Sequence, residues 1–300
     1  MVLRVSEEPG LLVRAEDGVE LALWRAQGGG EGAPARTAPP LLMVHGVFSN
    51  RTFFLGANER GLGRYLAGRG WDVWVAELRG HGRSGVDGQR RRWHFEDWIR
   101  LDAPALVGGV LEATGSDRLV WIGHSAGGVI GFAFGGLEHP LSRAIAGIAV
   151  AGAPAPTGLG MVQYPMAAAG LSVTRVLGRF PARFLGIGPE DEHPEIFAQW
   201  MRWNLRGRWL GADGTDYYAN TRRVRSRLLA LAGGGDWLIA PPDLCEDLAD
   251  ATSSEDRTFV TCGRDTGFSE DFNHHRLIAS TPARQEVWPL IGDWIETRFG

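Results

Sequence analysis

The chain contains no lysine. All 31 basic residues in this sequence of 300 residues are arginine. The absence excludes Schiff-base catalysis and the phosphate-binding lysine of a Walker-type loop, because both need an amine side chain. Two classes of enzyme are therefore ruled out before any motif is considered.

Cysteine is also scarce. The chain has two, Cys245 and Cys262, and their separation matches no pattern of metal ligands. The sequence does not establish a disulfide between them, because that depends on their separation in space. We interpret both as reduced residues that pack in the interior, and we expect no metal site and no organic cofactor.

The sequence has neither an excess of positive charge nor a long apolar run. The net charge is -4 and the pI is about 6.1. We interpret the arginine run at 90–92 as a solvated loop and do not expect nucleic acid as a partner. No apolar run reaches the roughly 18 residues that span a bilayer, and the first ten residues lack the apolar region of about 7 residues of a signal peptide. We expect no integral membrane segment and a cytoplasmic location.

Short apolar runs bounded by turn residues do recur along the chain. They lie at 41–46, 71–78, 119–125, 144–153 and 228–234, and a further strand is predicted at 257–262. Helical patterns fall between and after them, at 58–68, 93–114, 126–138, 242–251 and 283–299. Residues 11–24 are typical of a hairpin around an Asp-Gly turn. Continuous apolar strands that alternate with helices predict a doubly wound, mostly parallel α/β sheet.

This alternation breaks between about residues 155 and 220, where no strong strand pattern occurs. We predict a mostly helical cap at 155–220, inserted into a core made of residues 1–154 and 221–300. Apolar side chains of the cap are compatible with an acyl pocket or lid, and equally with packing of the cap onto the core. They are Met161, Tyr164, Met166, Phe180, Phe184, Phe197, Trp200, Met201, Trp203, Trp209, Tyr217 and Tyr218.

A GxSxG motif occupies residues 123–127, directly after the apolar run that contains LVWI. In such a motif the serine lies on a strained turn between a strand and a helix, and the glycines let the backbone pass closely. The motif predicts that Ser125 is a nucleophile. The alternative is a serine in an ordinary tight turn.

Several motifs, spaced in a consistent order, make the chain resemble an α/β-hydrolase over most of its length. His45-Gly46-Val47 resembles the segment that supplies half of an oxyanion hole, and the resemblance implies that the backbone N–H groups of Val47 and Ala126 bind the oxyanion. Residues 77–84 (ELRGHGRS) resemble the DxRGHGxS loop and depart from it at Glu77. We interpret the histidines of these segments as bracing or packing residues: His45, His81 and His124.

A nucleophilic serine needs a histidine base and a carboxylate that orients it. In this fold they follow the serine in the order acid, then histidine, on loops at the carboxyl ends of strands. The run at 144–153 ends without a carboxylate, whereas the run at 228–234 leads into Asp236. Asp236 is the predicted acid, and we interpret Asp243 as a charge at a helix N-terminus.

For the base, His274 and His275 follow Asp236. Residues 273–277 resemble the NHxDF or GHxDL ending of the family, and that alignment selects His274, with His275 as the alternative. Residues 234–238 with 242–244, and residues 70–74, resemble local patterns of the acid lipase branch.

The resemblance implies a serine hydrolase of the carboxylesterase or lipase type, with a small-molecule acyl ester as its substrate. An apolar or lipid-like ester is our hypothesis for that substrate. We predict a substrate pocket that includes Phe48, Trp200, Trp203 and Trp237. The alternatives are an acyltransferase or thioesterase that uses the same triad, and a ligand-binding protein of this fold without catalysis. The sequence leaves the oligomeric state unknown.

Overall fold

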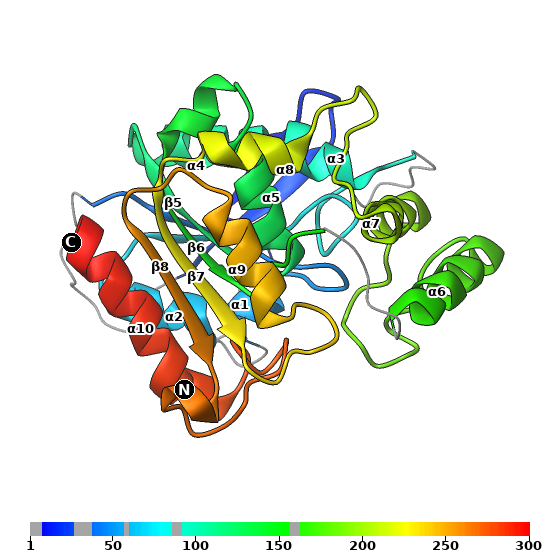
Figure 1. Cartoon of the computed structure of the whole chain (residues 1–300). Coiled ribbons are helices and arrows are strands. Elements are labelled where there is room, and N and C mark those ends of the chain that lie inside the picture. Colours follow the sequence, from blue (N-terminus) through cyan, green and yellow to red (C-terminus); the bar gives the residue numbers. More distant parts are fainter. Residues whose placement is uncertain (1–7, 27–37, 57–59, 86–91, 157–162) are drawn as a thin grey trace.

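A computed structural model describes residues 8–26, 38–56, 60–85, 92–156 and 163–300. These residues form an eight-stranded sheet of order β1-β2-β4-β3-β5-β6-β7-β8 (Figure 1). The strands are β1 (Leu11–Arg14), β2 (Glu20–Ala26), β3 (Leu41–Val44), β4 (Val73–Ala76), β5 (Leu119–His124), β6 (Ile145–Ala151), β7 (Arg227–Gly233) and β8 (Arg257–Cys262). The helices are α1 (Thr52–Leu55), α2 (Leu62–Gly68), α3 (Phe95–Asp97), α4 (Ala103–Thr114), α5 (Ala126–Gly135), α6 (Gln163–Leu177), α7 (Pro194–Arg206), α8 (Tyr217–Asn220), α9 (Pro242–Asp250) and α10 (Thr281–Phe299).

The sheet is parallel from β4 to β8, and β1 and β2 form an antiparallel hairpin at its edge. Helices cover both faces: α1, α2 and α10 lie on one side, and α4, α5 and α9 on the other (Figure 1). Every residue of β3, β4 and β5 is buried, as expected for strands covered on both faces. The predicted doubly wound, mostly parallel sheet is therefore confirmed.

The helix predicted at 93–114 is wrong in its first half. Residues Trp98–Asp102 form a π-helical turn between α3 and α4. Pro104 stands in the first turn of α4, and a proline has no N–H to donate to the carbonyl four residues earlier. The proline therefore separates a wide turn from the regular helix that follows.

Helices α6, α7 and α8 lie between β6 and β7, and Figure 1 shows α6 and α7 beside each other at the rim of the molecule. We call the chain between β6 and β7 that carries α6, α7 and α8 the inserted segment. It contributes Trp203, Trp209 and Tyr217 to the main apolar cluster. Met161, Arg90 and Arg91 lie outside the described residues.

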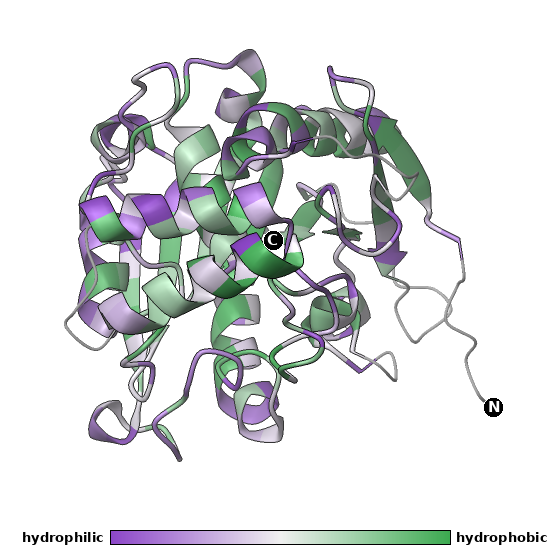
Figure 2. Cartoon of the chain, turned by 90° about the vertical axis from the view of Figure 1, so that its right-hand side faces the viewer, coloured by the Kyte–Doolittle hydropathy of each residue, from purple (hydrophilic) through white to green (hydrophobic). Residues whose placement is uncertain are grey.

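The interior is apolar and the outer helix surfaces are mixed, which Figure 2 shows as green strands inside helices that carry purple on their outer faces. Cys245 and Cys262 are both free and buried, as the sequence indicated. In the described parts of the chain, no helix combines the length and apolar character needed to cross a membrane.

Candidate active site

Ser125 stands between β5 and α5 in a strained conformation. Its φ is 53° and its ψ is -124°, a region that a residue with a side chain rarely adopts. A Cβ on Gly127 would lie 2.0 Å from the carbonyl oxygen of Val44, so a glycine is required where α5 passes the sheet. The Ser125 N–H donates to the carbonyl of Ala151 at 2.9 Å. These contacts hold the serine at the carboxyl end of the parallel strands.

Asp236 and His274 come from two loops that pack closely against each other. A Cβ on Gly233 would lie 2.2 Å from the carbonyl oxygen of Phe272, so a glycine as the last residue of β7 allows the loops to meet. The His274 Nδ1 lies 2.6 Å from Asp236 Oδ2. The other carboxylate oxygen of Asp236 accepts the N–H of Ile239 at 3.1 Å.

The hydrogen bond to Asp236 fixes the tautomer of His274. Because a carboxylate only accepts, Nδ1 carries the proton, and Nε2 is left to take one. The His124 Nε2 donates to the carbonyl oxygen of His274 at 3.0 Å, and the two rings are 4.7 Å apart. Burial, followed by the nearby His274, lowers the pKa of His124 well below its usual value, so its ring is neutral. His124 thus braces the backbone of the predicted base.

His45 braces the loop after β3. Its Nε2 accepts the N–H of Leu78 at 3.3 Å, and its Nδ1–H donates to the carbonyl of Gly46 at 2.7 Å. Burial lowers the pKa of His45 to about 3, so the ring is neutral. A Cβ on Gly46 would lie 2.8 Å from the Cβ of Ser125, which shows how closely this loop passes the serine.

The two predicted oxyanion donors flank Ser125 from different elements. Val47 follows Gly46 in the loop and lines the cavity that contains Ser125. Ala126 is the first residue of α5, and the first N–H groups of a helix have no acceptor within it.

A cavity of about 790 Å³ opens over Ser125 and His274. Its walls come from the loop after β3, from the α1–α2 connection, from the segment before α7 and from the start of α10. Many of its lining side chains are apolar, including Val47, Phe48, Phe53, Ile187, Ile239 and Trp288. The size and lining suit a small organic molecule.

The predicted pocket residues do not all lie at this cavity. Phe48 lines it, whereas Trp237 is 67% exposed and is not part of the lining. Trp200 and Trp203 correct the prediction, because both pack against Phe95, with ring centroids 5.1 Å and 5.4 Å from it. These two tryptophans join the inserted segment to the core instead of lining the cavity.

Glu77, where the sequence departs from the DxRGHGxS pattern, is fully buried and accepts several hydrogen bonds. It accepts hydrogen bonds from Trp24 Nε1 at 3.0 Å, from Arg51 Nη1 at 3.0 Å and from the N–H of Arg83 at 2.8 Å. A Cβ on Gly82 would lie 2.1 Å from this carboxylate. Glu77 therefore fixes the turn that carries His81.

Two carboxylates on the segment between α6 and α7 reach the loop after β3. Glu190 accepts Asn50 Nδ2 at 2.6 Å, and its own N–H donates to the carbonyl of Phe48 at 3.1 Å. Glu192 Oε2 accepts the N–H of Phe48 at 3.4 Å and lies 3.3 Å from His81 Nε2. Phe48 has a φ of 62°, so its backbone needs this support.

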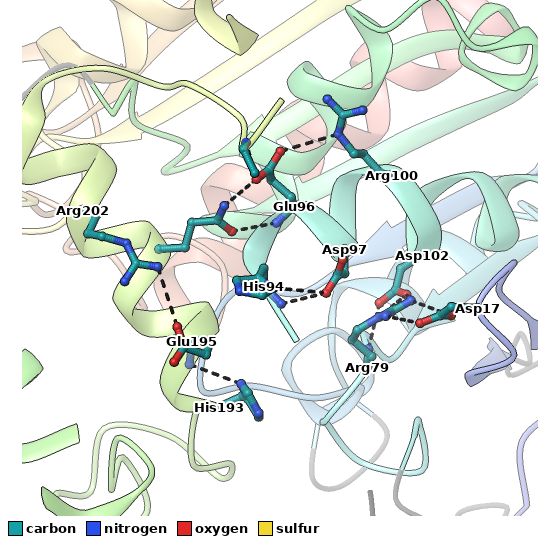
Figure 3. Close-up of polar contacts among 12 residues, drawn as sticks. Asp17, Arg79, His94, Glu96, Asp97, Arg100, Asp102, His193, Glu195 and Arg202 are labelled. Carbon is teal, nitrogen blue, oxygen red and sulfur yellow. Dashed lines mark hydrogen bonds and ion pairs between the residues drawn. The ribbon is translucent and has the colours of Figure 1, made fainter. Parts of the chain in front are cut away.

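A third carboxylate, Glu96, holds the inserted segment from the core side (Figure 3). Its Oε2 accepts Gln199 Nε2 at 2.6 Å and the N–H of Ala212 at 2.9 Å. Its Oε1 accepts the Tyr217 hydroxyl at 2.9 Å and lies 3.6 Å from Arg100 Nε.

Figure 3 also shows Arg79 between Asp17 and Asp102. Arg79 and Asp102 are fully buried, and Arg79 Nε donates to Asp102 Oδ1 at 2.7 Å. Burial raises the pKa of Asp102 to about 6, against the opposing effect of Arg79. The pair anchors the start of the glycine-rich loop.

No sequence motif marks the residues that join the inserted segment to the core, which are Asn50, Glu96, Glu190, Glu192 and Gln199. Each is a common polar residue outside any motif, and the sequence carries no signal that separates them from surface side chains.

Comparison with known proteins gives one family. A family model described as the alpha/beta hydrolase fold matches residues 39–183. Triacylglycerol lipase 1 of Arabidopsis thaliana is 30% identical over 129 residues, which cover 40% of this chain and 32% of the relative. Lysosomal acid lipase/cholesteryl ester hydrolase of Homo sapiens is 30% identical over 131 residues, which cover 40% of this chain and 33% of the relative. The matched region thus spans about a third of the length of these curated relatives.

A solved structure of a soluble variant of monoglyceride lipase from Saccharomyces cerevisiae has a TM-score of 0.69 and 16% sequence identity. The match covers 100% of this chain and 98% of that chain, and at this identity it shows the fold. The match to lysosomal acid lipase agrees with the local resemblance to the acid lipase branch. The sheet order, the family model and the solved structure agree: this chain has the α/β-hydrolase fold.

Proposed function

We propose that this protein is a serine hydrolase that cleaves a carboxylic ester through Ser125, His274 and Asp236. The observation that carries the proposal is the 2.6 Å contact between His274 Nδ1 and Asp236 Oδ2, beside a serine in a strained turn on the same cavity. A histidine oriented by a carboxylate next to a serine that lines a cavity is the arrangement that activates a serine.

In the proposed reaction, His274 Nε2 takes the proton of the Ser125 hydroxyl as Oγ attacks the acyl carbonyl. Asp236 stabilises the imidazolium through Nδ1–H. The N–H groups of Val47 and Ala126 donate to the oxyanion of the tetrahedral intermediate. The imidazolium then gives its proton to the leaving alcohol, and a water molecule activated by His274 releases the acid from the acyl-enzyme.

The lining of the cavity favours an ester with an apolar part. Phe48 lies over the cavity and stacks on Phe180 with ring centroids 5.0 Å apart. Two matched relatives are named triacylglycerol lipase and lysosomal acid lipase/cholesteryl ester hydrolase. Both names refer to enzymes that act on apolar esters. We also propose that residues 155–220 act as a cap, because Ile187 and Phe180 bring the inserted segment to the cavity.

Hydrolysis of p-nitrophenyl esters, from acetate to palmitate, tests the proposal. The wild-type protein is expected to hydrolyse at least one ester, and Ser125→Ala and His274→Ala are each expected to lose the activity. His275→Ala is the matched control, because His275 is the neighbouring histidine and lines the same cavity. Loss of activity with His275→Ala and its survival with His274→Ala would overturn the assignment of the base.

A fluorophosphonate probe separates the enzyme from a non-catalytic binding protein of the same fold. Labelling of the wild type and not of Ser125→Ala supports an activated serine. A folded wild-type protein that neither labels nor hydrolyses any ester of the series would contradict the proposed function. A preference for acetate over all longer acyl groups would contradict the apolar substrate alone.

A further inference from the structure

The catalytic cavity has one cationic end. Arg60 and Arg284 are both part of its lining, on the wall made by the α1–α2 connection and the start of α10. Among the described residues that line the cavity there is no aspartate and no glutamate. The other described residues of that wall are apolar or carry hydroxyl groups. Among the described residues of this end of the cavity, the two arginines are the charged side chains.

α2 packs against α10, and the two arginines lie near the starts of these helices. The rings of Tyr65 and Trp288 are 5.7 Å apart. One turn further along both helices, Arg69 Nη1 lies 2.9 Å from Asp293 Oδ1. The two helices therefore run side by side in the same direction, with matching steps of about four residues per turn. Arg60 lies two residues before α2 and Arg284 lies in the first turn of α10, so both are at the helix ends that line the cavity.

Neither arginine has an acidic partner in the described part of the chain. Two other arginines of this region do have one. Arg69 pairs with Asp293, and Arg51 pairs with Glu77. The Arg284 guanidinium lies 5.8 Å from the ring centroid of Trp288, and the first turn of α10 contains no acidic residue.

His275, which also lines the cavity, does not add a positive charge to the two arginines. Burial, followed by His274 and Arg276, lowers the pKa of His275, so its ring is neutral near pH 7. An oxyanion bound at this end of the cavity would be attracted by both guanidinium groups.

We propose that Arg60 and Arg284 form an anion subsite of the active-site cavity, and that the natural ester carries a carboxylate or phosphate group that binds there. A guanidinium matches the two oxygens of either anion with a pair of parallel hydrogen bonds. The inference rests on the proposed function, because it names the class of ester that Ser125 cleaves: one with an apolar part and an anionic end.

Matched pairs of p-nitrophenyl esters test the subsite. Hexanoate, octanoate and decanoate are compared with the mono-p-nitrophenyl esters of adipic, suberic and sebacic acids, which add a terminal carboxylate at the same chain length. We expect the wild type to prefer the anionic member of at least one pair in kcat/KM. Arg60→Gln and Arg284→Gln should each lower kcat/KM for that ester by about tenfold, and leave its neutral partner within about twofold.

Arg175→Gln is the control, because Arg175 is an exposed arginine of α6 that does not line the cavity. It should leave both esters unchanged. Raising the salt concentration should weaken the preference for the anionic ester, because the screening length falls to about 3 Å at 1 M. Equal losses for neutral and anionic esters in the two arginine variants would overturn the subsite, as would the absence of any preference at all three lengths.

Binding separates a failure of the subsite from a failure of the proposed function. Calorimetry with hexyl phosphate and with hexanoate, on Ser125→Ala and on the same variant with both arginines changed to glutamine, needs no turnover. Binding that the arginine changes abolish supports the subsite even if no ester is hydrolysed, and the tighter ligand identifies phosphate or carboxylate. Binding of both ligands that is absent, or unaffected by the arginine changes, would overturn it.

Discussion

Glu192→Gln removes one charge from the contact between the inserted segment and the loop after β3. The Glu192 side chain is 1% exposed, and its Oε2 lies 3.3 Å from His81 Nε2 and 3.4 Å from the Phe48 nitrogen. Glutamine keeps the shape and one oxygen that accepts the N–H of Phe48. The charge that faces His81 is lost.

The effect on stability depends on pH through His81. Burial lowers the pKa of His81, but the charges of Glu192 and Glu190 raise it more, and the net pKa lies above its usual value. The neighbouring His45 ring is neutral and adds no opposing charge. A group whose pKa is raised by folding stabilises the protein fully below its unfolded pKa of about 6.5. That stabilisation is lost as the pH rises through the raised pKa of His81.

The magnitude follows from the burial of the pair. Breaking a buried ion pair by removing one partner costs about 3–5 kcal/mol, and we expect about 3 kcal/mol here at low pH because glutamine keeps the backbone contacts. Once His81 is neutral, the loss should fall to about 1 kcal/mol, as for an ordinary hydrogen bond. At about 2 °C per kcal/mol, Tm should drop by about 6 °C at pH 5.5 and by about 2 °C at pH 9.

Thermal unfolding of the wild type and of Glu192→Gln across this pH range measures the difference. Glu195→Gln is the control on the same segment, because Glu195 forms a loose ion pair with Arg202 at 3.8 Å and both side chains are solvent-accessible. It should shift Tm by about 1 °C or less at every pH. A loss of stability in Glu192→Gln that stays constant with pH, or grows as the pH rises, would refute the role given to His81.

Three further changes follow from the same contacts. Asp236→Asn should lower kcat for ester hydrolysis by about 1,000- to 10,000-fold while fluorescence-detected unfolding stays near that of the wild type, because the carboxylate holds the tautomer of His274; a loss below tenfold would argue against Asp236 as the acid. Gly152→Ala should lower kcat by about 100-fold, since a Cβ there would lie 3.1 Å from His274 Nδ1, and unchanged steady-state kinetics would contradict this. Glu96→Gln should cost about 2–3 kcal/mol in urea unfolding, because a buried carboxylate that accepts the Tyr217 hydroxyl becomes neutral; an unchanged midpoint would show that this contact contributes little.

The fold could be predicted because its signals are local. A parallel strand covered on both faces must be apolar throughout, and β3 (Leu41–Val44) lies within the predicted run at 41–46 with every residue buried. The π-helical turn at Trp98–Asp102 gave no such signal. A helix interrupted by Pro104 and a helix that starts there have the same periodicity, so packing decides between them.

Some residues of the candidate site could also be predicted from the sequence, and others could not. The positions of Ser125 and Asp236 follow from strand ends and chain order, and the resemblance of residues 273–277 to the family ending selects His274. The structure brings the acid and this histidine to 2.6 Å. Trp200 and Trp203 are three residues apart and lie on one face of α7, which is typical of pocket residues and of core residues alike. The contact with Phe95 separates the two possibilities, and it joins residues about a hundred positions apart in the chain.

The role proposed for Arg60 and Arg284 could not be predicted from residue type. In a chain whose basic residues are all arginine, neither Arg60 nor Arg284 stands out in the sequence. Their positions become informative once their contacts are known. Arg276, by comparison, pairs with Glu270 at 2.8 Å, and this ion pair accounts for its charge. Arg60 and Arg284 come from segments more than two hundred residues apart, lie near the starts of α2 and α10, and line the cavity that contains Ser125. A charge without an acidic partner among the described residues at such a place is best accounted for by the molecule that the cavity binds.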